Sequence, residues 1–199
     1  MNFPGESGGK LPDINNENEW SDTTFPTLAF GQGLSVNAVQ TTSVFATIAN
    51  DGVRMLPRLI AGYSNTEGVY EPTMIDEGVR VVSPETAKTV REMLEGVVSE
   101  DGTAKNMQIP GYRVGGKTGT ANRYDEATGG YSGYTSSFIG MAPAEKPALV
   151  MSVSIHNPKT STYGSVVAGP VFKKVMTYAL AHKKVPPSTT KPPKLPVEW

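Results

Sequence analysis

Apolar residues between positions 35 and 49 recur at the three-to-four-residue spacing of one helical face. The segment is followed by Asn50-Asp51-Gly52, a run that tolerates the left-handed backbone in which helices commonly stop. At its start, Ser35 and Asn37 are both able to cap a helix. We therefore expect a buried helix over 35–49, capped by one of these two residues.

Two later segments have the same helical period. Ser83, Pro84 and Glu85 are the N-cap, the first-turn proline and the first-turn acid of a helix start, and apolar residues follow them at helical spacing. The segment 166–183 carries an apolar stripe and ends in a basic run at 182–184, where positive charge opposes the helix dipole. The sequence predicts one helix starting at Ser83 and another over 166–183.

Three segments in the second half of the chain are typical of β-strands: 112–121, 135–141 and 149–155. In the last of them, alternate residues are apolar, as expected when one face of a strand is buried. A short, proline-containing connection at 142–147 separates the second strand from the third and suits a hairpin, so we expect an antiparallel meander. The predicted fold class is α/β of the α+β type, an antiparallel sheet covered by helices.

The remaining segments lack a regular period. Residues 1–26 are polar and irregular, and glycines and prolines divide 53–82 into pieces that suit a small strand and loops. Five prolines make 185–199 a candidate for an extended, polyproline-like tail. We expect one domain over 1–184 and a tail over 185–199.

Composition narrows the classes of function. The chain has 199 residues, which gives room for one domain with a core, and a formal net charge of -1, so no basic field exists to attract nucleic acid. The absence of cysteine excludes disulfides and thiol catalysis, and no metal-binding or phosphate-cradling spacing is present, so no cofactor is expected. His156 and His182 have no acidic or serine partner in a recognisable motif, and we interpret them as a strand end and a helix-end charge.

The segment 116–121 reads Gly-Lys-Thr-Gly-Thr-Ala and is the most informative in the chain. Lys117, Thr118 and Thr120 place an ammonium and two hydroxyls on a short extended segment, and Gly119 lets a ligand approach the backbone. Such a segment can hold a carboxylate. The two residues before the lysine, Gly115 and Gly116, are either a β-bulge or small residues that keep this approach open.

Several other segments accompany this motif in a fixed order. They are Phe3-Pro4-Gly5-Glu6, Phe30-Gly31-Gln32-Gly33-Leu34-Ser35, Ala46-Thr47-Ile48-Ala49-Asn50-Asp51-Gly52, Tyr134-Thr135-Ser136-Ser137-Phe138-Ile139-Gly140, and Ala168-Gly169-Pro170-Val171-Phe172. Together with the Lys-Thr-Gly element, a signature of penicillin-binding proteins and serine β-lactamases, they cover about residues 1–180. The chain resembles the C-terminal part of a class B penicillin-binding protein, the monofunctional peptidoglycan D,D-transpeptidase, and is most similar to the cell-division type.

The resemblance implies a role for each residue of the motif. Lys117 would supply positive potential and hydrogen bonds, and Thr118 and Thr120 would receive the substrate carboxylate across Gly119. The backbone N–H of Thr120 would be one donor of the oxyanion hole. The ligand would be a peptidoglycan stem peptide or a β-lactam.

The family's nucleophile, the serine of S-x-x-K on a helix, has no convincing match. Ser7-Gly8-Gly9-Lys10 fits by letters, but two glycines oppose the helix that would bring the lysine amine to the serine hydroxyl. Ser35-Val36-Asn37 fits the family's S-x-N element by letters and is better explained as a helix start. We expect the chain to begin partway through the transpeptidase domain, to be incomplete, and to lack the catalytic serine and its lysine.

Two other interpretations remain open. The chain would be a catalytically silent, shortened homologue that binds divisome proteins, or a fragment that complements a separate N-terminal half carrying the nucleophile. In either case the parent protein would act at the extracytoplasmic face of the bacterial membrane. No apolar run in the chain approaches the ~20 residues needed to span a bilayer, so this chain itself is expected to be soluble, without an anchor or signal peptide.

Overall fold

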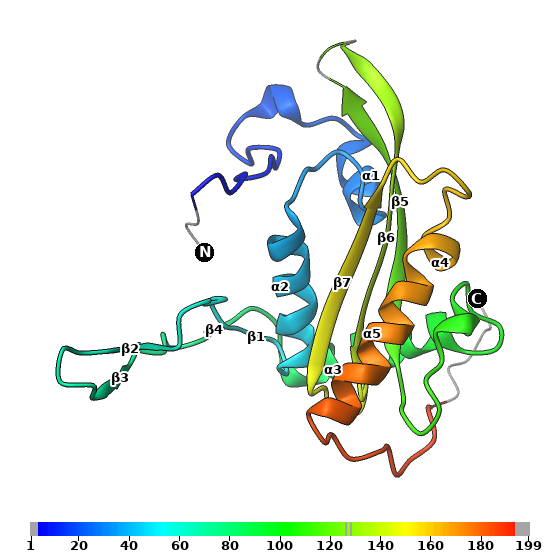
Figure 1. Cartoon of the computed structure of the whole chain (residues 1–199). Helices are drawn as coiled ribbons and strands as arrows, with labels where there is room; N and C mark the ends of the chain where they lie inside the picture. The colour runs from blue at the N-terminus through cyan, green and yellow to red at the C-terminus, as the bar shows by residue number, and fades with distance from the viewer. Residues whose placement is uncertain (1–3, 126, 128, 194–199) are drawn as a thin grey trace.

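A computed structural model describes residues 4–125, 127 and 129–193. A central antiparallel sheet lies between helices, and an arm extends away from this body (Figure 1). The helices and strands, in chain order, are η1 (Glu17–Glu19), α1 (Thr24–Ala29), α2 (Ala38–Ala49), β1 (Val53–Arg54), β2 (Gly62–Ser64), β3 (Tyr70–Pro72), β4 (Val79–Arg80), α3 (Pro84–Val98), η2 (Lys105–Met107), β5 (Gly115–Asp125), β6 (Gly130–Ala142), β7 (Leu149–His156), α4 (Gly164–Val167) and α5 (Gly169–His182).

The central sheet has the strand order β5-β6-β7, and both pairs are antiparallel. Thr118 of β5 lies opposite Phe138 of β6, which lies opposite Val153 of β7. The predicted meander is therefore confirmed, although β5 begins at Gly115 rather than at the predicted residue 112, and all three strands continue beyond their predicted ends. Two smaller two-stranded sheets, β1-β4 and β2-β3, are the only other sheets among the described residues.

The hydrophobic core lies between one face of this sheet and α5. The rings of Phe138 and Phe172 meet edge to face with centroids 4.7 Å apart, and both side chains are fully buried. On the opposite face, α3 packs on β5, where Leu94 lies against Gly115, and α2 packs on β6 and β7. The core cluster consists of Val98, Ala104, Met107, Ile109, Val114, Phe138, Ala142, Ala168, Phe172, Met176 and Leu180.

Helix α3 begins as its sequence predicts. The Ser83 hydroxyl accepts a hydrogen bond from the backbone N–H of Thr86 at 3.1 Å, and Pro84 is the first helical residue. A backbone hydrogen bond at Glu85, followed in importance by its hydrogen bond with Ser83, holds the pKa of the Glu85 carboxyl below its ordinary value. Each of these three residues therefore has the predicted role at this helix end.

Helix α2 has the predicted cap, but the prediction that this helix is buried is wrong. Asn37 is the N-cap and forms a capping box with Gln40, so one of the two proposed caps is confirmed. Only Thr47 of this helix is buried, while Val44 is exposed. The helix contacts β6, β7 and α3, and its first turn is hydrogen-bonded to the N-terminal segment through Asn37 and Gln40.

The last predicted helix is divided in two. Helix α4 ends at Val167, and α5 starts at Gly169, so a break at Ala168 separates them. A Cβ atom at Gly169 would lie 2.4 Å from the sulfur of Met107, so any larger residue would have to displace the buried Met107 side chain. Within α5, Phe172, Met176 and Leu180 are buried as predicted, but Val175 of the same stripe is exposed.

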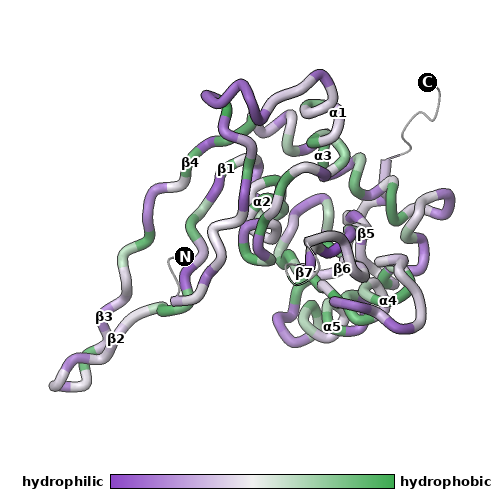
Figure 2. The backbone as a smooth tube through the Cα atoms, turned by 90° about the horizontal axis from the view of Figure 1, so that it is seen from above, coloured by the Kyte–Doolittle hydropathy of each residue, from purple (hydrophilic) through white to green (hydrophobic). Residues whose placement is uncertain are grey.

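Strands β2 and β3 form the tip of an arm that projects from the body between β1 and β4 (Figures 1 and 2). The sequence predicted a small strand and loops over 53–82, whereas the structure has four short strands there, β1 to β4, with loops between them. The arm exposes many large apolar side chains, among them Met74, whose exposed fraction is 92%. Exposed apolar surface of this kind is typical of regions that contact other molecules.

The N-terminal region is irregular up to η1, in agreement with the sequence pattern, although residues 1–3 lie outside the described part. Helix α1 overlaps the end of the predicted loop and was not expected. An isolated bridge joins the backbones of Lys10 and Ser35 and attaches this region to the start of α2. Among the described residues, no helix combines the length and apolar character needed to cross a bilayer.

Candidate functional site

The segment Lys117–Thr120 lies on β5, at one edge of the central sheet. Lys117 is opposite Ile139 and Thr120 is opposite Ser136, so the segment is in register with the middle of β6. One hollow lies in the arm beside Met74 and another lies beside the C-terminal segment 188–193, and neither is lined by Lys117–Thr120. That Lys117–Thr120 forms one wall of a binding site stays a prediction.

The strand's pleat places the polar groups of this wall on two faces. Thr118 and Thr120 lie opposite Phe138 and Ser136 and share the face that meets α5, since directly opposed residues of an antiparallel pair lie on one side of the sheet. Lys117 follows two residues after Gly115, which packs on α3, so it shares the α3 face. The Lys117 ammonium thus lies on one face of the edge strand, and the hydroxyls of Thr118 and Thr120 lie on the other.

The hydroxyl of Thr120 has a partner that the sequence did not reveal. It donates to the backbone carbonyl of Thr162 at 3.1 Å, and the fully buried Ser136 hydroxyl donates to the same oxygen at 2.5 Å. Because a carbonyl oxygen has two lone pairs, it can accept both bonds, and Ser136 continues to satisfy it if Thr120 turns to a ligand. The strand pairing of Ser136 with Thr120 was predictable only from the hairpin register, and a backbone carbonyl leaves no signal in a sequence.

Lys117 is exposed, and its Nζ donates to the carbonyl of Thr118 at 3.0 Å. Within residues 4–125, 127 and 129–193, no hydrogen bond joins a serine hydroxyl to a lysine amine. The segment Ser7–Lys10 is not helical, so it lacks the geometry that S-x-x-K requires, and Ser35 lies before α2, where Asn37 acts as the cap. Among the described residues, neither Ser7 nor Ser35 is therefore hydrogen-bonded to Lys117.

The glycines of this region allow close packing. Gly115 and Gly116 are paired in register with Met141 and Gly140, so the alternative of a bulge is wrong; the register shift in β5 lies later, between Asn122 and Tyr124. A side chain at Gly116 would come within 2.6 Å of the Phe138 ring.

Gly164, the first residue of α4, packs directly on the strand that carries the motif. A Cβ atom there would lie 2.1 Å from the Ser137 carbonyl oxygen and 2.9 Å from that of Gly119. Both contacts are with backbone, which cannot move aside as a flexible side chain can. The first residue of α4 therefore packs against the backbone of Gly119.

Gly164→Ala is expected to lower the free energy of unfolding by about 1–3 kcal/mol, because overpacking must push α4 away from β5. Chemical denaturation followed by circular dichroism measures this change. Gly130→Ala in β6 is the control, since its Cβ would meet no atom within 4 Å, and we expect a change within about 0.5 kcal/mol. Equal stability of the two variants would show that α4 is not held against Gly119.

The two histidines lie where the sequence placed them. His156 ends β7, and its Nδ1 is 2.9 Å from the hydroxyl of Thr135, while His182 ends α5 and stacks on Tyr178. The part of the chain that the structure describes contains no group of three or more potential metal-ligating side chains. Neither histidine is in hydrogen-bond contact with the described groups of the site.

Residues 1–177 match the family description "Penicillin binding protein transpeptidase domain". Over its whole length the chain is 37% identical to penicillin-binding protein PbpB of Mycolicibacterium smegmatis, and over 98% of its length it is 37% identical to PbpB of Mycobacterium tuberculosis. It spans 32% and 30% of the lengths of these relatives.

Solved structures give the same result. Penicillin-binding protein 3 of Mycobacterium tuberculosis, in complex with ampicillin, has a TM-score of 0.84 and 36% identity, covering 96% of this chain and 44% of that one. A peptidoglycan synthetase from Bifidobacterium adolescentis has a TM-score of 0.86 and 30% identity, covering 100% of this chain and 35% of that one. The α+β fold predicted from the sequence is therefore confirmed.

Proposed function

Because the chain belongs to the penicillin-binding protein transpeptidase domain family, we propose that it forms part of a peptidoglycan D,D-transpeptidase domain that cross-links stem peptides during cell division. The observation that carries this proposal is the strand Lys117–Thr120, which lies at a sheet edge with its ammonium and hydroxyls on either side. The domain would act on the outer side of the bacterial membrane.

In this reaction a serine hydroxyl attacks the carbonyl carbon of the penultimate D-Ala of a stem peptide. The amide bond breaks, the terminal D-Ala leaves with the proton of the hydroxyl, and an acyl-enzyme ester remains. An amine of a second stem peptide then attacks the ester, which forms the cross-link and frees the serine. A β-lactam would acylate the same serine and remain attached.

The chain's own contribution would be to hold the substrate and stabilise charge. Thr118 and Thr120 would donate their hydroxyls to the terminal carboxylate, and Lys117 would add positive potential from the other face of the strand. Thr120 would give up its bond to the Thr162 carbonyl, which Ser136 would continue to satisfy. The backbone N–H of Thr120 would donate to the oxyanion.

None of the serines of this chain is the nucleophile in this proposal. Labelled penicillin incubated with the purified chain and followed by a denaturing gel is expected to leave no covalent label. A label retained on the chain would overturn the assignment of the serine to a different segment. The proposal therefore makes the chain a substrate-binding part of the site.

Complementation tests the binding role directly. The upstream part of the Mycolicibacterium smegmatis relative, expressed separately and mixed with this chain, is expected to become labelled by penicillin. With Lys117→Ala the labelling rate should fall about 10- to 100-fold, the range expected for loss of a charge-assisted hydrogen bond. Labelling that does not depend on Lys117 would contradict the role given to this strand.

A catalytically silent binding module is the second candidate function. The observation that favours it is the arm, whose apolar side chains are exposed around β2 and β3. A division-complex protein would then be the partner. Capture of such a partner by the chain, with no labelling in the complementation mixture, would favour this candidate over the transpeptidase.

A further inference from the structure

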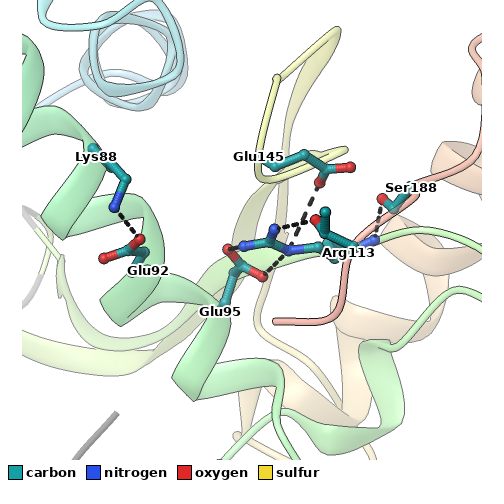
Figure 3. A network of polar contacts seen from close by, with 7 residues as sticks. Lys88, Glu92, Glu95, Arg113, Glu145 and Ser188 are labelled. Carbon is teal, nitrogen blue, oxygen red and sulfur yellow. Dashed lines mark hydrogen bonds and ion pairs between the residues drawn. The ribbon is translucent and has the colours of Figure 1, made fainter. Parts of the chain in front are cut away.

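Arg113 precedes β5 by two residues and lies at the centre of a buried polar network (Figure 3). Its Nε and Nη2 donate to the two carboxylate oxygens of Glu95 at 2.8 and 2.7 Å, and the exposed fractions of the two side chains are 11% and 3%. The Arg113 carbonyl accepts from the Ala144 N–H at 2.9 Å. Arg113 therefore links α3, the turn between β6 and β7, and the start of β5.

The C-terminal segment 185–190 docks on the same region. The Tyr112 hydroxyl donates to the Val185 carbonyl at 2.7 Å, and the Ser188 N–H donates to the Gly111 carbonyl at 2.9 Å. This part of the predicted tail is thus bound to the body, while residues 194–199 lie outside the described part. The family match ends at residue 177, before this segment begins.

Two further bonds connect the segment to Arg113 itself. The Arg113 backbone N–H donates to the Ser188 hydroxyl at 2.9 Å, and its Nη1 donates to the Thr190 hydroxyl at 2.8 Å. With Glu95 bound to Nε and Nη2, every nitrogen of the guanidinium has a partner, as a buried arginine requires. The backbone bond to Ser188 is partly buried and the Nη1 bond to Thr190 is exposed, so loss of the Ser188 hydroxyl is expected to cost more than loss of the Thr190 hydroxyl.

We propose that Val185–Thr190 is a strap that fixes the first residues of β5 through Arg113, which makes Arg113 a positioning residue for Lys117–Thr120. Lys117 is four residues beyond Arg113, and a Cβ atom at Gly115 between them would lie only 3.3 Å from the Cβ of Leu94, so this part of the chain lies close against α3. Movement of Arg113 is therefore transmitted to the lysine along the backbone. The importance of this positioning for catalysis rests on the proposed function, but the strap itself does not.

Amide hydrogen exchange on the full chain, resolved by NMR, tests the strap. In the double variant Ser188→Ala with Thr190→Ala, the slowly exchanging amides of residues 115–119 are expected to exchange on the order of tenfold faster, the factor expected for one to two lost hydrogen bonds. Amides of β7 should be unchanged, because no bond of the strap reaches that strand among the described contacts.

Two controls separate positioning from general destabilisation. Thr189→Ala alters the exposed residue between the two strap hydroxyls and should leave exchange unchanged, and Ser188→Thr keeps a hydroxyl and should retain the native rate. Unchanged exchange in the double variant would overturn the proposal, as would an equal acceleration in all three strands. The measurement uses no penicillin, so its failure is separate from failure of the proposed function.

Discussion

Glu95→Ala is expected to lower the free energy of unfolding by about 3–5 kcal/mol, because it removes the hydrogen-bonded partner of the buried Arg113 guanidinium. Glu95 accepts two hydrogen bonds from Arg113, and it is this bonding, above all, that raises the pKa of the arginine beyond its usual value. Glu145, 3.8 Å from Arg113 Nε, is too distant to replace the two bonds. Urea denaturation followed by circular dichroism measures the loss.

The same helix offers a matched control. Lys88 and Glu92 form an exposed ion pair one turn earlier on α3 (Figure 3), so Glu92→Ala should cost no more than about 0.5 kcal/mol. Because folding raises the pKa of Arg113, the stabilisation from this group is fully present below its unfolded-state pKa. That stabilisation is lost only as the pH rises through the folded-state pKa. The difference between the two variants should thus be the same at about pH 6 and pH 8. Similar losses in both variants would contradict a buried, paired Arg113.

Phe138→Ala is expected to cost about 3–5 kcal/mol and to lower the melting temperature by roughly 10 °C. Its ring is fully buried against Phe172, and Phe138 is the cross-strand partner of Thr118. A cavity would therefore open beside β5, on the face of the sheet that carries Thr118. Differential scanning calorimetry measures the change.

Tyr134→Ala provides the comparison in the same strand. Tyr134 belongs to β6 but is exposed, so loss of its ring should cost less than about 1 kcal/mol. If the two substitutions had similar effects, the core would not lie between β6 and α5. If only Phe138→Ala lowered the melting temperature, the result would support a core between β6 and α5.

Local signals in the sequence were sufficient for much of the fold. Ser83 caps α3 and Asn37 caps α2 because each needs only the backbone of the next turn, and alternation along β7 follows from the pleat alone. The exposure of Val44 could not be predicted in this way, since an apolar helix face says nothing about what covers it. The break before Gly169 has a local signal that the prediction missed, because Pro170 has no backbone N–H to donate and suits the first turn of a new helix.

In the candidate site, too, some features could be predicted from the sequence and others could not. The residues Lys117–Thr120 could be identified from their order in the chain, together with the segments around them. The Thr162 carbonyl could not, because any residue can present a backbone oxygen. Arg113 pairs with Glu95, but the surrounding segments contain several other charged residues at similar distances along the chain. This pairing could therefore not be predicted from the sequence.

The strands β5, β6 and β7 are joined by two short connections, 126–129 and 143–148, whereas α2 ends at Ala49 and meets a strand that begins at Leu149. Chain-closure entropy makes contacts between sequence neighbours quicker to form than contacts across some hundred residues. During refolding we expect the three-stranded meander to be protected first and α2 to dock last. Pulse-labelling of amides along the refolding time course would reveal that order.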